Sequence, residues 1–319
     1  MRIFPILCSV LGLVASAASQ NLRKGLVRAD AVVVARQVGK KAHGEQIALH
    51  RLQIIQNVRG AAEHKAVTVL DWPKLSLHQR PTPRQSRLYC LQDASAAATR
   101  MGLAASEGPY FKMTGWAGSN PLIGKDLTKD PIVRFANVLA DSETGTAPDI
   151  TASTLAGMAI SAEPVVRTEI ARFLGERTDL RGKLSSMHWT QLVARAAGEM
   201  EDIEYKIALA ELCAAQRLDG LLDALAVSLG PVQDVRFARC VGRIGKALYG
   251  EEATSKLTDR LKYAGQQQDR KMLLLAIGAT NTKSALDALL QMDRTDAAVT
   301  AALKEHHSPR AKEAAGRRK

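Results

Sequence analysis

The second half of the chain alternates apolar stretches with short polar turns, in a pattern that repeats. Residues 222–225 read LDAL, and the same four residues return 64 positions later, at 286–289. A looser version, LTDRL, lies between them at 257–261. The average spacing is about 32 residues, and a period of that size is typical of stacked supersecondary units. The alternative is an ordinary all-α bundle, which gives no structural cause for such an echo.

The apolar residues within each repeat have helical spacing. Ala285, Ala288, Leu289 and Met292 occupy positions i, i+3, i+4 and i+7, which places them on one face of a helix. The stretch 272–277 is apolar on all sides, so a helix there must be covered by several neighbours. The spacing predicts five helix pairs, at 151–160 and 163–177, 186–198 and 202–216, 218–229 and 231–248, 252–264 and 267–278, and 283–293 and 295–306.

Turn signals separate these helices. Glycine tolerates the left-handed conformation that ends a helix, so three glycines are predicted to end helices: Gly175, Gly245 and Gly278. Gly230 and Pro231 predict a helix end followed by a new first turn. After Gly278, either Thr282 or Ser284 could cap the next helix.

The pattern VR…(A/L)-IG…AL-D-ALL is similar to HEAT-like repeats, the short-helix α-solenoids of the armadillo type. The resemblance covers residues 150–306, about half the chain. It implies a rigid stack of helix pairs with a long curved surface, and such surfaces usually hold a protein segment. The expected partner is therefore an unknown protein or peptide on the solenoid surface.

Residues 26–116 follow a different, strand-like rhythm. β-Branched and alternating stretches bounded by Gly, Pro and polar loops predict five short strands, at 30–38, 47–60, 66–72, 87–92 and 110–116. Five short strands point to a small barrel or sandwich. The alternation in the second strand slips by one residue, which predicts a β-bulge at His50 and Arg51. A helix is expected at 130–141, with Pro131 in its first turn.

The stretch RADAVVVARQV…ALHRLQIIQNVRG resembles a small OB- or netrin-like β-domain of exported bacterial proteins, through its strand rhythm and its final Arg59-Gly60 pair. The netrin-type group usually begins with a disulfide-bonded Cys, which this chain lacks near its expected mature start. An inhibitor function is therefore not carried over from that group.

The first residues, MRIFPILCSVLGLVASAASQ, predict a signal peptide over 1–18 that is cleaved after Ala17 or Ala18. The alternative is a membrane anchor, but the apolar run 3–14 is shorter than the roughly 20 residues that a span needs. We therefore expect a secreted or periplasmic protein that is not integral to a membrane after cleavage. The expected parts are the signal peptide at 1–18, a β-domain with a closing helix at 19–141, a linker at 142–149, the solenoid at 150–306 and a basic disordered tail at 307–319.

Composition and charge favour this layout. Hydrophobic residues make up 46% of the chain and aromatics only 4%, which favours Ala- and Leu-rich helices. The net charge of +12 is concentrated in residues 19–150, at +7, and in residues 304–319, at +4. Candidate contacts to an envelope polyanion or anionic membrane surface are Lys40, Lys41, Arg80, Arg84, Arg87, Arg310, Lys312, Arg317, Arg318 and Lys319. The simpler interpretation is that dispersed cations keep the protein soluble.

Three cysteines follow the expected signal peptide: Cys90, Cys213 and Cys240. Cys213 and Cys240 are predicted on the second helices of adjacent pairs, where they could form a disulfide, but they are about one turn out of register. The alternative is two buried thiols. Cys90 is predicted in the core of a strand face.

No motif for catalysis is present: the sequence has no HExxH, no CxxC pair and no GxSxG. The histidines have irregular spacing, and we expect them to be solvated or in loops. We expect no catalytic residue, no metal site and no cofactor, and no nucleic-acid partner, because no aromatic residues interleave the charges. The expected function is that of a non-catalytic binding or scaffold protein. The alternative is electrostatic attachment through the basic β-domain and the tail.

Overall fold

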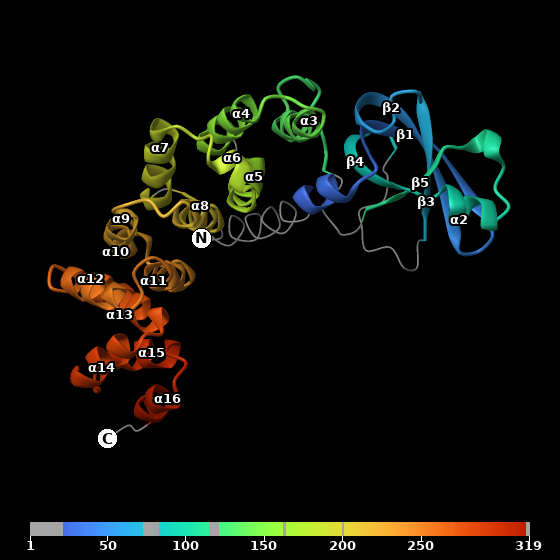
Figure 1. The fold of residues 1–319 in the computed structure, drawn as a ribbon. Coiled ribbons are helices and arrows are strands. Elements are labelled where there is room, and N and C mark those ends of the chain that lie inside the picture. The colour runs from blue at the N-terminus through green and yellow to red at the C-terminus, as the bar shows by residue number, and fades with distance from the viewer. Residues whose placement is uncertain (1–21, 73–82, 115–120, 162–163, 200, 317–319) are drawn as a thin grey trace, which may run out of the picture. The chain divides into compact units, whose positions relative to one another are not determined.

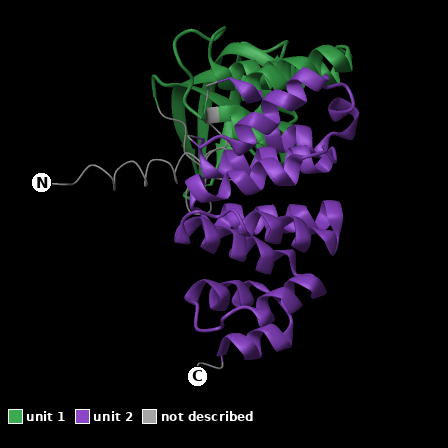
Figure 2. Ribbon diagram, turned by 90° about the vertical axis from the view of Figure 1, so that its left-hand side faces the viewer, with its two compact units in different colours: residues 1–158, 162–170 green, residues 159–161, 171–319 purple. Residues whose placement is uncertain are grey.

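The chain forms two compact units, which Figure 2 separates by colour: residues 1–158 with 162–170, and residues 159–161 with 171–319. The computed structural model describes residues 22–72, 83–114, 121–161, 164–199 and 201–316. The expected order of an N-terminal sheet followed by helices is confirmed. The predicted signal peptide lies outside the described residues.

The first unit contains a five-stranded sheet. Its strands are β1 (Ala31–His43), β2 (Ile47–Arg59), β3 (Ala66–Asp71), β4 (Ser86–Asp93) and β5 (Tyr110–Met113). Their order is β1-β2-β3-β5-β4, and β4 also pairs with β1, so the sheet closes into a barrel. The β3–β5 pair is parallel and the other four are antiparallel. All five predicted strands are present.

The irregularity predicted in β2 lies in its partner β1. Gln37 pairs with Leu52 and Gly39 with Arg51, so Val38 has no partner in β2. Across the same positions β2 keeps a regular register with β3. The predicted bulge at His50 and Arg51 is therefore wrong in its strand. A slip in the alternation of one strand indicates an irregularity in its pairing with a neighbour. The extra residue of the bulge can belong to either of the two strands.

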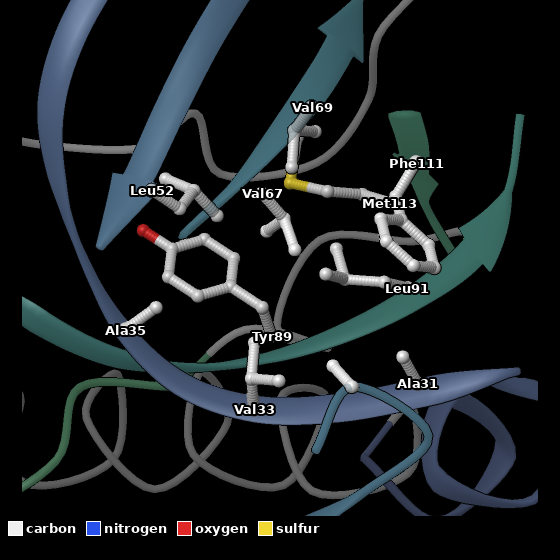
Figure 3. Packing of buried hydrophobic residues seen from close by; sticks show 11 residues of the cluster. Ala31, Val33, Ala35, Leu52, Val67, Val69, Tyr89, Leu91, Phe111 and Met113 are labelled. Carbon is white, nitrogen blue, oxygen red and sulfur yellow. The ribbon is translucent and has the colours of Figure 1, made fainter. Parts of the chain in front are cut away.

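Alternate residues of the strands fill the barrel, as the two-residue period of a strand requires. Figure 3 shows this core, which consists of Ala31, Val33, Ala35, Leu52, Ala61, Val67, Val69, Tyr89, Leu91, Phe111 and Met113. The largest of these side chains is Tyr89, which is fully buried. Burial raises the pKa of Tyr89 to about 12, although the nearby charge of Arg87 acts in the opposite direction.

The helical elements that follow the first strands in the chain include α2 (Ser95–Arg100), the short 3₁₀ helix η1 (Ala105–Glu107) and α3 (Pro131–Glu143). A further helix, at residues 22–28, precedes the sheet. The α3 helix begins as predicted, with Pro131 in its first turn and the Asp130 side chain accepting hydrogen bonds from two backbone N–H groups of that turn. It contacts β2, and Arg59 of β2 forms an ion pair with Glu143 of α3. The predicted linker, 142–149, contains the end of α3 and the start of the next helix.

The rest of the described chain is helical. Its helices are α4 (Pro148–Ile160), α5 (Pro164–Glu176), α6 (Thr178–Arg181), α7 (Ser186–Ala197), α8 (Ile203–Ala215), α9 (Leu221–Val227), α10 (Leu229–Val232), α11 (Val235–Tyr249), α12 (Glu252–Leu261), α13 (Gln267–Thr280), α14 (Lys283–Gln291), α15 (Ala297–Glu305) and α16 (Pro309–Gly316). The predicted helices agree with these bounds to within a few residues at most ends.

The second unit has two layers of helices (Figure 1). In the first layer α8 contacts α11, α11 contacts α13, and α13 contacts α15. In the second layer α7 contacts α9, and α9 contacts α12. Successive helices also pack across the layers, as α7 does on α8 and α12 on α13. Each apolar helix is thus covered by neighbours of its own layer and of the other.

The three glycines predicted to end helices lie inside them instead. Gly175, Gly245 and Gly278 belong to α5, α11 and α13. Asn281, in the left-handed conformation, follows the end of α13. A Cβ atom at Gly278 would lie 2.1 Å from the carbonyl oxygen of Ala302 in α15, so this glycine is needed for close helix packing rather than for a turn.

Two further boundaries differ from the sequence prediction. Gly230 and Pro231 lie inside the short helix α10, and α11 begins only after Asp234, whose side chain accepts hydrogen bonds from the first-turn N–H groups. Next, Thr282 rather than Ser284 caps α14, through its bond from the Ala285 N–H. A side-chain cap decides each boundary, because it satisfies backbone donors that the helix leaves unpaired.

The tail that was expected to be disordered forms α16 over most of its length. The Ser308 side chain accepts a hydrogen bond from the Ala311 N–H at the start of this helix. Ala311 and Ala315, four positions apart, are buried on one face of α16. The basic composition of 307–319 concealed this small apolar stripe.

Cys90, Cys213 and Cys240 are buried, and none of them forms a disulfide within the described part of the chain. Cys213 lies on α8 and Cys240 on the neighbouring α11, as predicted, but no disulfide joins them. With a repeat of 32 residues they are five positions out of register, or about 7.5 Å along the helix axis, which a disulfide cannot bridge. Burial raises the pKa of Cys90, Cys213 and Cys240 to about 12 in each case.

Candidate functional sites

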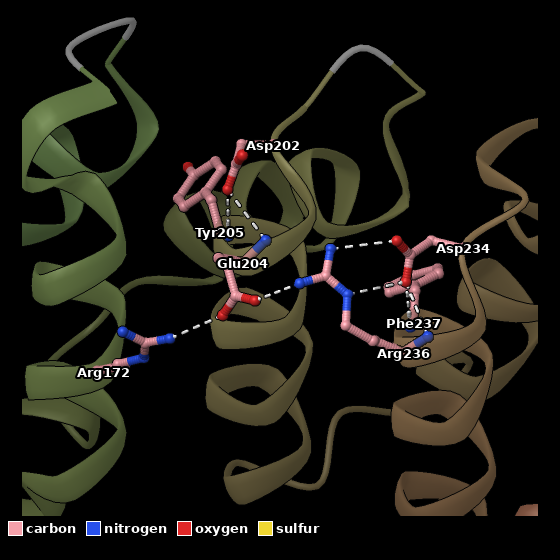
Figure 4. A network of polar contacts seen from close by, with 7 residues as sticks. All are labelled: Arg172, Asp202, Glu204, Tyr205, Asp234, Arg236 and Phe237. Carbon is pink, nitrogen blue, oxygen red and sulfur yellow. Dashed lines mark hydrogen bonds and ion pairs between the residues drawn. The ribbon is translucent and has the colours of Figure 1, made fainter. Parts of the chain in front are cut away.

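A ladder of charges crosses three helices of the second unit at intervals of 32 residues (Figure 4). Glu204 of α8 accepts hydrogen bonds from Arg172 of α5, at 3.2 Å, and from Arg236 of α11, at 2.8 Å. The three residues therefore occupy equivalent places on neighbouring helices. The charge ladder, Arg172–Glu204–Arg236, was not singled out from the sequence, although its regular spacing is visible there.

The same interval recurs at the starts of these helices. Asp202 caps α8 and Asp234 caps α11, each by accepting bonds from backbone N–H groups of the first turn. Tyr205 and Phe237, three residues further on, are both buried. Figure 4 shows the two caps with their aromatic residues in matching orientations on adjacent helices. The 32-residue period predicted from LDAL is thus also present in the helix caps.

The two LDAL segments lie in matching positions in the second layer. The first belongs to α9 and the second to α14, and in each the two leucines are buried. The half-exposed aspartate of each segment lies near an arginine of a later helix. Asp223 lies 3.7 Å from Arg260 of α12, and Asp287 lies 4.0 Å from Arg310 of α16.

The exposed face of α11 carries four cations at helical spacing: Arg236, Arg239, Arg243 and Lys246. Arg239 forms two hydrogen bonds with the Glu305 carboxylate of α15, at 2.6 and 2.7 Å, and this pairing raises the pKa of Arg239. Arg243 lies 3.8 Å from Glu211 of α8. Together with the charge ladder, these pairs make a surface in which carboxylates on α8 lie beside cations on α11.

A buried lysine lies beneath this surface. The Lys206 side chain on α8 is fully buried, donates a hydrogen bond to the carbonyl oxygen of Gly198, and has its ammonium group 4.7 Å from the centre of the Phe237 ring. Burial lowers the pKa of Lys206 to about 8, although the charges of Glu201 and Glu199 act in the opposite direction. Its position in an apolar helix gave no sign of a special role.

Replacing the central carboxylate of the charge ladder is expected to have a moderate effect. Glu204→Gln removes one partner from both Arg172 and Arg236 and should lower the free energy of unfolding by about 1 kcal/mol, with a smaller loss at high salt. The matched control is Glu211→Gln, where the carboxylate is more than half exposed. There the free energy of unfolding should fall by only a few tenths of a kcal/mol, roughly the value of an exposed ion pair. Urea denaturation at two salt concentrations measures both. Equal losses in the two variants would contradict the ladder.

The first unit contains a cavity of about 410 Å³, the β-unit cavity, lined by Gly39, Lys40, Lys41, Leu49, Arg51, Thr68, Ser106 and Glu107. Lys40 and Lys41 were predicted in a hairpin loop, but they belong to strand β1, which continues to His43. The ammonium group of Lys41 lies 3.1 Å from the Glu107 carboxylate. Two cationic side chains, those of Lys41 and Arg51, thus share this cavity with one carboxylate, while Lys40 pairs with His50 on the other face of β1.

Arg51 is fixed at the wall of the β-unit cavity. One of its terminal nitrogens donates to the hydroxyl of Thr68, at 2.9 Å, and to the carbonyl oxygen of Glu107, at 3.0 Å. The Thr68 hydroxyl donates to the same carbonyl at 2.6 Å. Sequence reasoning missed Arg51, Thr68, Ser106 and Glu107, because strand pairing and the η1 segment bring them together from distant parts of the chain.

The other predicted polyanion contacts do not gather at one site. Arg87 is 93% buried and donates a hydrogen bond to Gln85, so its prediction as a surface contact is wrong. It faces inward because it pairs with the inward-facing Ala35. Arg84 is exposed, and Arg310 and Lys312 are exposed on α16. The remaining candidates, Arg80, Arg317, Arg318 and Lys319, lie outside the described residues.

The histidines expected to be solvated include two buried ones. His50 faces the barrel interior, and its Nε2 lies 3.4 Å from the carboxylate of Asp71, which is also buried. His306 is buried in the second unit, where its Nε2 lies 2.9 Å from the carbonyl oxygen of Thr282. Each is held by a polar partner inside its unit, which the irregular spacing in the sequence did not reveal.

Within the described residues, no three His, Cys, Asp or Glu side chains come together in a way that could hold a metal ion. No helix in this described part is both long and apolar enough to cross a membrane. Comparison of the chain with protein-family models, with curated proteins and with solved structures found no match.

Proposed function

We propose that the chain is an exported, non-catalytic binding protein, and that its second unit is a HEAT-like solenoid. The observation that carries this proposal is the charge ladder, in which Arg172, Glu204 and Arg236 recur every 32 residues on neighbouring helices. Equivalent residues on successive helices are what a stack of repeats produces, since each unit contacts its neighbours in the same way. A bundle around one centre has no such requirement.

The ligand surface that we propose is the exposed face of α8 and α11, defined by Glu204, Ile207, Glu211, Arg236, Arg239 and Arg243. Its carboxylates and cations alternate and lie on rigid helices, which suits a protein segment that carries charges of both signs. The ion pairs already present there can be exchanged for pairs with such a segment at little net cost in free energy. The partner is therefore an extended peptide region of another protein.

Photo-crosslinking of the full chain tests this surface. A benzoylphenylalanine at Ile207, between the two carboxylates of α8, should crosslink to a polypeptide in envelope extracts. The matched control is the same group at Met187 of α7, which is 63% exposed and lies in the other layer. We expect a discrete crosslinked band from position 207 and none from position 187. Equal crosslinking at both positions, or none at position 207, would refute the proposed surface.

The second candidate function is attachment to an envelope polyanion through the first unit. The observation that favours it is the β-unit cavity, in which Lys41 and Arg51 outnumber the single carboxylate of Glu107, with the exposed Lys40 on the other face of the same strand. Retention on a heparin resin tests it. The double variant Lys40→Ala/Lys41→Ala should elute at lower salt than the parent chain, by more than Lys283→Ala/Lys304→Ala does. Equal shifts in elution salt for the two double variants would mean that only the net charge of the protein matters, and would refute this candidate.

A further inference from the structure

The β-unit cavity has the size of a small-molecule site. Its volume of about 410 Å³ falls within the range of ligand pockets, roughly 300–1,000 Å³. Its walls come from β1, β2, β3 and η1. The strands are hydrogen-bonded into the closed sheet, so three of the four walls are rigid.

The guanidinium group of Arg51 is oriented in advance. One of its terminal nitrogens is held by Thr68 and by the carbonyl oxygens of Glu107 and Gly108. These bonds fix the plane of the guanidinium group. Because the group is planar, the directions of its other N–H groups are then fixed as well. A pre-oriented guanidinium binds a carboxylate or phosphate oxygen at a lower entropic cost than a flexible chain does.

Only one of the two neighbouring lysines of β1 faces the cavity. Lys41 is paired with Glu107 across the cavity, at 3.1 Å, through side chains that are 68% and 44% exposed. Lys40 pairs with His50 and therefore lies on the opposite face of β1. An anion that entered the cavity would compete with Glu107 for Lys41 and would also meet Arg51. The surplus of one positive charge favours an anion over a neutral molecule.

The cavity also offers groups that a simple inorganic anion would not use. Glu107 carries a carboxylate that can only accept hydrogen bonds, and the Ser106 hydroxyl can donate or accept. Leu49 adds an apolar contact at the wall. A ligand that satisfies all of them needs one anionic group for the cations, hydroxyl donors for Glu107, and a carbon skeleton for Leu49.

We propose that the β-unit cavity binds a small hydroxylated anion, such as a sugar acid, with Arg51 and Lys41 on its anionic group and Glu107 on its hydroxyl groups. The inference rests on the second candidate function, since a polyanion built of such units would present the same group to the cavity. It is narrower, because it requires the single unit to bind by itself.

Titration of the full chain with D-glucuronate, followed by NMR or calorimetry, tests the proposal. We expect saturable binding of D-glucuronate, weaker binding of acetate, which lacks hydroxyl groups, and no binding of neutral D-glucose. Arg51→Met and Lys41→Ala should each weaken glucuronate binding about tenfold, because each removes a charge-assisted hydrogen bond. Lys65→Ala is the matched control: it removes an exposed lysine of the same unit that does not line the cavity.

Arg51→Met also removes bonds to the backbone, so Lys41→Ala, at an exposed position, keeps the test independent of folding. An equal loss in Lys65→Ala and Lys41→Ala would overturn the proposal, as would equal binding of glucose and glucuronate. Heparin retention separates it from the second candidate function. Retention without glucuronate binding would refute the small-molecule site alone, while glucuronate binding without retention would support the site and refute attachment to a polyanion.

Discussion

Replacing Gly278 with alanine should destabilise the helical unit by about 3 kcal/mol. The new Cβ would lie 2.1 Å from the carbonyl oxygen of Ala302, much closer than van der Waals contact allows. That oxygen is a backbone atom of α15, so it cannot turn away as a flexible side chain could. The α13 and α15 helices must move apart, which opens gaps along their whole contact. Denaturation by urea, followed by far-ultraviolet circular dichroism, measures the loss.

Gly175→Ala is the matched control for this prediction. Gly175 also lies inside a helix, α5, but an added Cβ would meet no atom within 4 Å. Alanine has the higher helix propensity, so this variant should be more stable by about 0.5–1 kcal/mol. Opposite signs for the two substitutions are expected. A loss in both, or a gain in both, would show that the close approach of α13 and α15 is not what Gly278 provides.

Lys206→Met should stabilise the protein at neutral pH, by up to about 3 kcal/mol. The buried ammonium group has a pKa lowered from 10.5 to about 8 by burial, so the folded state holds its charge at a cost that the unfolded state does not have. Methionine has a similar length and no charge. The lost hydrogen bond to the carbonyl of Gly198 reduces the gain.

The pH dependence distinguishes this cause from better packing. Below pH 8 Lys206 is charged in both states and the full cost is present, whereas above pH 10.5 it is neutral in both and the cost is gone. Between these values the unfolded state binds more protons, so the stability that Lys206 contributes rises with pH. The stability difference between Lys206→Met and the parent chain should therefore shrink between pH 8 and pH 10.5.

Subtracting the two curves is necessary because the thiols have the opposite effect. Cys90, Cys213 and Cys240 have a pKa raised to about 12 in the folded state, so their contribution to stability falls as the pH rises above 9. All three are present in both proteins and cancel in the difference. A difference that stays constant with pH would show that Lys206 is not charged at a cost in the folded protein.

The sequence by itself determined the elements and their order. The helical spacing of Ala285, Ala288 and Leu289 records a buried face, and the LDAL echo records the period of the repeat. Asp130, followed by Pro131, marked the start of α3 correctly. These features depend on local backbone geometry, because a helix or strand must turn a fixed set of positions toward whatever covers it.

Only the tertiary structure decided what each buried or polar position meets. It made Gly278 a contact between helices instead of a helix end, and placed the bulge opposite Arg51 at Val38 of β1 instead of at His50 and Arg51 themselves. It turned Arg87 into the barrel, and it brought Arg51 and Glu107 to one cavity from positions 56 residues apart. A periodic pattern records that a face is covered, but the identity of the covering atoms depends on how distant segments pack, and this has no local signature in the sequence.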